Sequence, residues 1–256
     1  MLAPRLRAVT ILSIVLGVLF AAPAAFAAAQ VNKLSLVLSA NPTSLQPKEF
    51  NDQVIGTINR NVLDPRGLEH LDDISFAWLF DAQLRYFVRP NFTVEFGAGQ
   101  LRSIVRREYL PALNAAVQYQ AEVLSVPVHI GGAYYFAPYN AGDFQARAYA
   151  GGGMTSNVYN RERFTSAESN TDTLTTLGGS YSISGKGDSP GYYLETGVHM
   201  FFASRYSVMV GMLYRSAVTR TMYGTLQRGG VNYDLGPVVS LDTSGLGLRF
   251  GVSIGL

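Results

Sequence analysis

The feature that most constrains the fold of this chain is a two-residue alternation of apolar with small or polar side chains. It is clearest at residues 246–256, where one set of alternate positions is apolar throughout: Leu246, Leu248, Phe250, Val252, Ile254 and Leu256. The positions between them carry Gly, Ser and one Arg. Successive side chains of a strand point to opposite faces, so this segment predicts a strand with one apolar and one polar face.

The same alternation recurs along the chain and predicts eight strands. They cover residues 33–39, 74–88, 92–99, 124–136, 144–154, 192–202, 206–215 and 246–256. Short connections at 89–91, 137–143 and 203–205 alternate strictly with long ones at 41–73, 107–117, 161–190 and 223–243. Short periplasmic turns and long extracellular loops in this order are typical of an all-β, eight-stranded antiparallel up-and-down transmembrane β-barrel.

Aromatic residues on the apolar faces form two groups. One lies beside the short turns: Tyr86, Phe92, Tyr134, Phe136, Phe144, Phe202 and Tyr206. The other lies near the long connections: Phe76, Trp78, Tyr192 and Tyr214. Amphipathic rings favour the lipid headgroup level, so the two groups predict the two aromatic girdles of a membrane barrel.

The first 27 residues have the pattern of a cleaved secretory signal peptide. Arg5 and Arg7 precede a short apolar run, and Ala25-Phe26-Ala27 forms an A-x-A site, with cleavage after Ala29 as the alternative. Residues 28–256 then form the barrel domain. The whole chain has 20 basic and 18 acidic residues, so removing two arginines leaves 18 of each. A neutral mature chain has no basic field that would attract nucleic acid.

Three segments depart from simple strands and turns. Pro127 lies inside a predicted strand, where it predicts a bulge or a missing ladder hydrogen bond. In the first long connection, Phe50, Val54, Ile58 and Val62 recur every four residues and predict a short amphipathic helix. The dipeptides Gly178-Gly179 and Gly229-Gly230 lie between alternating runs and predict hairpins that extend beyond the membrane.

Residues 125–136 (SVPVHIGGAYYF), residues 85–91 (RYFVRPN) and the closing strand resemble the small outer-membrane β-barrels of Gram-negative bacteria, the OmpA/OmpX/OmpW-like superfamily. The resemblance covers about residues 31–256. It implies a monomer in the cell outer membrane, in contact with outer-membrane lipids and lipopolysaccharide. It also implies that the barrel-assembly machinery recognises the C-terminal strand.

The inward faces of the predicted strands carry a set of charged residues and histidines. They are Asp81, Arg85, Glu95, His129, Arg147, Glu195, His199, Arg215 and Arg249. If residues 89–91 form a three-residue turn, Arg85 lies opposite Glu95. Eight strands leave an interior just wide enough for side chains to fill it, which favours an ion-paired plug. A gated pore, whose salt bridges exchange partners, is the alternative.

Catalysis, metal and cofactor binding are not expected. Some barrels of this size are lipid A deacylases with a His-x-Ser motif, but Ile130-Gly131 follow His129 and Met200-Phe201 follow His199. Three scattered histidines and no cysteine offer no metal-ligand spacing. We therefore expect a structural role, or a surface-interaction role with a ligand at the exposed loops. The alternative, which the OmpW-like barrels suggest, is a passive channel or transporter for small molecules, hydrophobic ones included, with the first-loop helix as a lid.

Overall fold

Eight strands hydrogen-bond side by side and close into a ring. The structure is a computed structural model that describes residues 32–112, 115–170, 180–202 and 205–256. In ring order the strands are β1 (Leu34–Ser44), β2 (Phe76–Arg89), β3 (Phe92–Ala112), β4 (Ala115–Tyr135), β6 (Phe144–Asn170), β7 (Tyr181–Phe201), β8 (Tyr206–Thr219) and β12 (Gly245–Gly255). Every pairing in the ring is antiparallel, and β1 pairs with β12. The predicted fold class is confirmed.

The predicted faces of the strands are also confirmed. Large apolar side chains are exposed around the outside of the ring, among them Phe80, Phe96, Ile130, Leu194, Val210 and Leu248. The side chains between them, such as Arg85, Glu95 and Arg249, are buried in the interior. An apolar surface that surrounds a whole barrel cannot be left in water, whereas a closed barrel pairs its backbone groups internally. The fold therefore has the architecture of a membrane-spanning barrel.

Four strands continue well beyond the membrane ring, and this corrects one expectation. Residues 107–117 and much of 161–190, expected to be loops, belong to β3, β4, β6 and β7. The alternation continues there with its faces exchanged: the inner face is apolar, with Val105, Tyr109 and Val117 in or against a hydrophobic cluster, and the outer face carries polar residues such as Arg106 and Gln118. Residues 113–114 and 171–179, which include Gly178-Gly179, lie outside the described residues.

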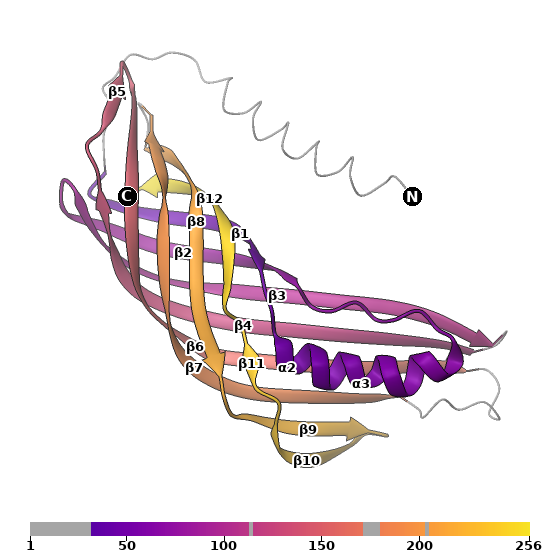
Figure 1. The fold of residues 1–256 in the computed structure, drawn as a ribbon. Coiled ribbons are helices and arrows are strands. Elements are labelled where there is room, and N and C mark those ends of the chain that lie inside the picture. The colour runs from indigo at the N-terminus through magenta and orange to yellow at the C-terminus, as the bar shows by residue number, and fades with distance from the viewer. Residues whose placement is uncertain (1–31, 113–114, 171–179, 203–204) are drawn as a thin grey trace.

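The extended strands form an open sheet that curves around a helical segment (Figure 1). In this region β7 changes its partner from β8 to β9 (Met222–Arg228), which pairs in turn with β10 (Val231–Val238). Gly229 and Gly230 both have positive φ in the turn between β9 and β10, so the predicted hairpin at these glycines is confirmed. Two very short strands, β5 (Tyr139–Ala141) and β11 (Leu241–Asp242), pair with β6 and β8.

The predicted helix in the first long connection is present, but its buried face differs from the expectation. It consists of α2 (Lys48–Phe50), η1 (Asn51–Ile55), α3 (Gly56–Ile58), η2 (Asn59–Leu63) and η3 (Asp64–Arg66). Phe50, Ile55 and Leu63 are buried, whereas Val54, Ile58 and Val62 are only partly buried. Because η1 and η2 are π-helical, the wider turns move the buried stripe away from a strict spacing of four.

Two asparagines fasten this helical segment to the chain that returns from it. Asn51 exchanges hydrogen bonds with the backbone of Ile74, with Nδ2 donating to Ile74 O at 2.9 Å and Ile74 N donating to Oδ1 at 3.1 Å. Asn59 makes the same reciprocal pair with Leu71, at 3.0 and 2.9 Å. The helical segment 48–66 and the return segment 67–75 therefore form one unit.

The irregularity predicted at Pro127 is confirmed as a bulge. Val126 pairs with Tyr159 and Pro127 with Asn157, which leaves Val158 as an extra residue in β6. On the other side of β6, Ser156 pairs with Pro190 of β7. Because proline lacks an N–H, neither Pro127 of β4 nor Pro190 of β7 can donate a ladder hydrogen bond to this part of β6.

Along the described ranges, no helix is both long and apolar enough to cross a bilayer. The proposed signal peptide, residues 1–27, lies outside the described residues, so its cleavage stays a prediction.

Replacing Phe80 with arginine tests the assignment of the outer face. Phe80 is 57% exposed in the middle of the apolar band of β2. We expect Phe80→Arg to make folding into lipid bilayers less favourable by about 2–4 kcal/mol, since an arginine near the bilayer centre is poorly solvated. Ala141→Arg, at an exposed position of β5 beside a short turn, is the control and should cost far less. Equal folding of the two variants in vesicles would show that the outer face is misassigned.

Candidate functional site

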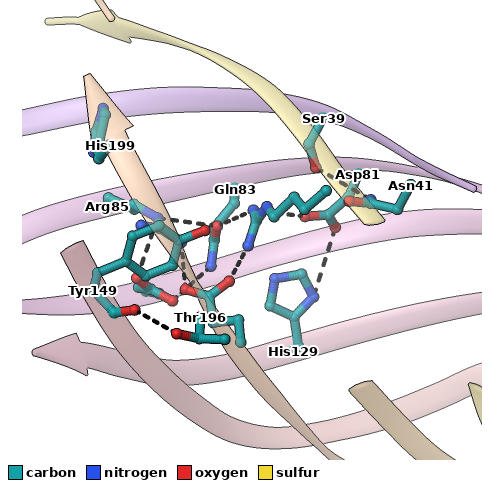
Figure 2. A network of polar contacts seen from close by, with 12 residues as sticks. Ser39, Asn41, Asp81, Gln83, Arg85, His129, Tyr149, Thr196 and His199 are labelled. Atoms are coloured by element: carbon teal, nitrogen blue, oxygen red, sulfur yellow. Dashed lines mark hydrogen bonds and ion pairs between the residues drawn. The ribbon is translucent and has the colours of Figure 1, made fainter. Parts of the chain in front are cut away.

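Two arginines share one carboxylate across the interior of the barrel (Figure 2). Arg85 of β2 donates from Nη2 to Glu195 Oε1 at 2.5 Å, and Arg249 of β12 donates from Nη1 to Glu195 Oε2. All three side chains are fully buried or nearly so. Alternation along β2, β7 and β12 points them inward, and their opposite charges allow them to be buried together.

A second carboxylate and an amide complete the pairing of these arginines. Arg85 Nε lies 3.1 Å from Glu95 Oε1, and the register places Arg85 directly opposite Glu95, as predicted. Gln83 donates to Glu95 Oε2 at 2.8 Å, and its Oε1 accepts from Arg249 Nη2 at 2.6 Å. Gln83 therefore links the two arginines, and we call these five residues (Gln83, Arg85, Glu95, Glu195 and Arg249) the central network.

Aromatic and histidine side chains extend the central network toward the short-turn end. Arg85 Nη1 donates to Tyr135 OH at 2.7 Å, and the same hydroxyl lies 3.0 Å from His199 Nδ1. The other ring nitrogen of His199, Nε2, lies 2.7 Å from Ser207 Oγ. The Arg85 guanidinium also lies over the Tyr149 ring, 5.2 Å from its centroid. The polar atoms in this part of the lumen thus largely satisfy one another.

On the other side of the central network, Asp81 lies 3.7 Å from both His129 Nδ1 and Arg249 Nη2. His129 has room because Gly97 pairs with it, and a Cβ at Gly97 would lie 2.5 Å from His129 Nε2. A cavity of about 20 Å³, bordered by Asp81, His129, Arg249 and Arg215, separates these groups from the Arg215 guanidinium. That volume is about enough for one water molecule.

The structure brings most of the predicted lumen residues together, with two exceptions. Arg215 is buried but donates to the backbone oxygen of Thr243 at 2.9 Å, without an ion pair to any described carboxylate. Arg147 lies at the short-turn end and donates to Pro90 O at 2.6 Å and to Gln145. Arg147 is therefore no part of the central network. A side chain at the mouth of the barrel can reach backbone oxygens and water, so it needs no buried partner.

Sequence reasoning missed Gln83, Tyr135 and Tyr149 as members of this site. All three occupy inward positions of the two-residue alternation, which was the available signal. Uncharged side chains give no signal of ion pairing in the sequence, although these three supply hydrogen bonds that the buried charges require.

Beyond the membrane ring the interior becomes apolar. Phe50, Ile55 and Leu63 of the helical segment pack with Leu101, Val123 and Phe164 from the wall, all almost fully buried. Glu162 is a buried acid in this upper region. Burial, and to a smaller extent the Glu49 carboxylate, raises the pKa of Glu162 from its ordinary value of 4.5 to about 8. Glu162 Oε2 has no hydrogen-bond partner among the described residues.

The described residues contain no cluster of histidine, aspartate or glutamate side chains that could hold a metal ion. His70, a loop residue, contacts Asp64 at 2.6 Å on the exposed surface. The arrangement inside the barrel is suited to holding strands together across the lumen and to blocking it.

No family model matches the sequence, and no curated protein matches it. Similar solved structures include a major outer membrane protein from Thermus thermophilus, with 9% identity, 86% of this chain and 98% of that chain covered, and a TM-score of 0.44. The N-terminal β-barrel domain of Pseudomonas aeruginosa OprF has 11% identity, coverage of 88% and 98%, and a TM-score of 0.36. Neisserial surface protein A has 12% identity, coverage of 87% and 96%, and a TM-score of 0.36. Identities and TM-scores this low do not extend the roles of these proteins to the chain.

Removing the charge of Glu195 tests the central network. We expect Glu195→Gln to lower the free energy of unfolding by about 3–5 kcal/mol, because two buried guanidiniums lose their shared carboxylate. The quadruple variant Arg85→Met/Glu95→Gln/Glu195→Leu/Arg249→Met should lose less, since it leaves no charged side chain in the central network. Urea unfolding in detergent micelles measures both. Arg147→Gln is the control, with an expected loss of about 1 kcal/mol or less. A loss for Glu195→Gln no larger than that of the control would contradict the interpretation.

The upper region should become less stable as the pH rises. The pKa of Glu162 is about 8 in the folded protein and 4.5 when it is solvated, so the folded state binds the proton more tightly. The stabilisation that comes from the raised pKa of Glu162 is complete below about pH 4.5 and is lost as the pH rises through about 8. Amide hydrogen exchange in β6 and β7 should therefore speed up between pH 5 and 9, after correction for intrinsic exchange.

Glu162→Gln should abolish this pH dependence, because the amide does not ionise. Glu108→Gln, at an exposed position of β3, is the matched control and should leave the dependence in place. A pH dependence that persists unchanged in Glu162→Gln would exclude Glu162 as its source.

Proposed function

We propose that this chain is a monomeric outer-membrane β-barrel with a closed lumen, which acts as a structural or surface-interaction protein and not as an open channel or an enzyme. The observation that carries the proposal is the Glu195 carboxylate, which joins Arg85 and Arg249 across the lumen. Bound in this way, side chains from opposite walls occupy the path that a solute would take.

The membrane location is supported by the outer surface. Exposed apolar residues surround the ring, and aromatic rings mark both ends of the band. Trp78 stacks on Phe80 and contacts Phe76 near the long connections, while Tyr134 packs on Phe136 beside the short turns. Two aromatic levels separated by aliphatic residues match the two interfaces of a bilayer. The outer membrane is the membrane in which barrels of this type reside.

The closed state is supported by two barriers in series. The central network fills the lower lumen with charged pairs, and the helical segment 48–66 packs into the apolar upper region. Glu49 on the helical segment also accepts a hydrogen bond from Ser240 N at 2.9 Å, which ties the segment to the chain between β10 and β11. A solute would have to displace both barriers.

A role without catalysis is supported by the surroundings of the histidines. His199 and Ser207 have the contact expected of a base and a nucleophile. However, the second nitrogen of His199 faces the Tyr135 hydroxyl and not a carboxylate, and the nearby cavity, lined by Ser207 but not by His199, has a volume of only about 10 Å³. His129 contacts Asp81, and His–Asp pairs of this kind also occur as structural contacts.

Passive transport of small hydrophobic molecules is the second candidate, and one observation favours it. The upper interior is lined by apolar side chains, and what fills it is the helical segment, a unit that the chain could lift away. Transport would then need a route past the central network. Deletion of residues 46–73 discriminates the two candidates, because it removes the upper barrier alone.

Conductance in planar bilayers tests the closed lumen. We expect the wild type and the variant without residues 46–73 to show no steady unitary current, because the central network remains in both. Replacing Glu195 by Gln in the shortened variant should produce a current, since both barriers are then weakened. Each variant is first checked for barrel folding by heat-modifiable migration on gels.

A wild-type current that disappears when Arg85 and Glu95 are changed would overturn the closed-lumen proposal in favour of a gated pore. Altered lipid A in cells that express the protein would overturn the proposal that it is not an enzyme. Increased uptake of a hydrophobic solute on deletion of residues 46–73, in a folded barrel, would favour transport.

A further inference from the structure

A groove of about 370 Å³ crosses the outer face of the upper sheet, on β6, β7, β9 and β10. Its lining is cationic and rich in hydrogen-bond donors, and includes Arg161, Arg163, Ser182, Ser184, Lys186 and Thr225. We call it the basic groove. It lies outside the barrel and shares no residue with the central network.

The charges in the basic groove are poorly balanced by the protein itself. Arg161 pairs directly with Lys186 across β6 and β7, and like charges at directly opposite positions destabilise a sheet. The Glu122 carboxylate is shared between Arg161, at 3.2 Å, and Arg102, at 2.9 Å. Among the described residues, Arg163 and Lys186 make no ion pair, although the exposed Asp188 is nearby on β7. An anion between these cations would relieve the repulsion.

The basic groove continues into a second depression that is more apolar. This depression, of about 530 Å³, is lined by Val158, Tyr159 and Tyr223, by Lys186, which borders both grooves, and by Ser156, Gly187 and Asp188 at its edge. Val158 is 55% exposed and Tyr223 is 66% exposed. The bulge in β6 at Val158 helps to shape this depression. The combined surface is amphipathic, with apolar and aromatic side chains on one side of Lys186 and cations on the other.

The position of the combined surface along the barrel indicates its partner. Lys186 precedes Tyr192, in the outer aromatic girdle, by six residues of β7. A strand advances about 3.3 Å per residue and tilts by about 40° in a barrel, so Lys186 lies roughly 15 Å beyond that girdle. Tyr223 pairs directly with Lys186, and Val158 lies between the two levels, opposite the stretch from Gly187 to Ser189. This is the layer occupied by the headgroups of the outer leaflet.

We infer that the basic groove binds the phosphorylated headgroup of lipopolysaccharide, with phosphate at Arg163 and Lys186 and the lipid end of the molecule against Val158 and Tyr223. The inference rests on the proposed outer-membrane location. The serine and threonine hydroxyls supply further donors to phosphate oxygens, and guanidinium and ammonium groups bind phosphate strongly. The apolar depression next to the cations favours a glycolipid over a soluble polyanion.

Binding of a short, phosphorylated lipopolysaccharide to the folded barrel in detergent micelles tests the inference. The double variant Arg163→Gln/Lys186→Gln should bind roughly tenfold more weakly, or worse, because two charge-assisted contacts are lost. The double variant Lys33→Gln/Arg205→Gln removes the same charge at the short-turn end and should change binding by less than about twofold. The same lipopolysaccharide after dephosphorylation should bind the wild type as weakly as the groove variant does.

Three results would overturn the inference: wild-type affinity in the groove variant, equal affinity of the wild type for the dephosphorylated lipid, or binding of a sulfated polysaccharide through Arg163 and Lys186 without binding of the lipid. Insertion of each variant into lipid vesicles is measured in parallel. If the wild type does not insert, the proposed function fails and the inference fails with it. If every variant inserts and binding ignores the groove, only the inference fails.

Discussion

The structure depends on one carboxylate held between two guanidiniums. Glu195 is 110 residues from Arg85 and 54 from Arg249, yet it binds both inside the lumen. Buried charges of this kind are tolerated only when each has a partner, so the three strands must keep the separation at which these contacts form. Gln83 and Tyr135 then take up the remaining donors of the arginines. The number and stagger of the strands set the cross-section of the lower barrel, and these contacts bridge it, with the other inward side chains packed around them.

The interior has two different solutions to the same problem of filling space. Within the membrane ring, polar side chains fill the lumen and hydrogen-bond one another, because a lipid-facing exterior leaves the inward positions as the place for polar groups. Beyond the ring the wall is an open sheet, and the chain supplies its own cover in the form of the helical segment. Apolar residues such as Val123 and Phe164 can face inward there because Phe50 and Leu63 cover them. The change from polar to apolar lining therefore follows the change from closed barrel to covered sheet.

Local periodicity made the strands and their faces predictable, and a short turn made the pairing of Arg85 with Glu95 predictable. The contact of Arg249 with Glu195 was not predictable. It depends on the stagger of the strands when the barrel closes, which is a property of all eight strands. The length of β3 and β4 was missed because the alternation in their outer ends is inverted, with apolar residues on the inner face and polar ones such as Arg106 and Gln118 on the outer face. The buried stripe of the helical segment was misplaced because a π-helical turn advances by more residues than an α-helical one. The charged lumen residues could be predicted from the sequence, whereas the neutral residues that hydrogen-bond to them could not.

The helical segment follows β1 directly in the chain, but the surface on which it rests is distributed over much later residues, from Leu101 to Met222 and Leu241. The helical segment therefore cannot pack in its final position as soon as it is synthesised. Its seat exists only after β9 has joined β7 and the chain has reached β11. Contacts between residues far apart in the sequence form late in folding. The chain must lose the entropy of closing a long loop before such a contact can stabilise it. We therefore expect the helical segment to insert late in folding, after the strands that form its binding surface have paired.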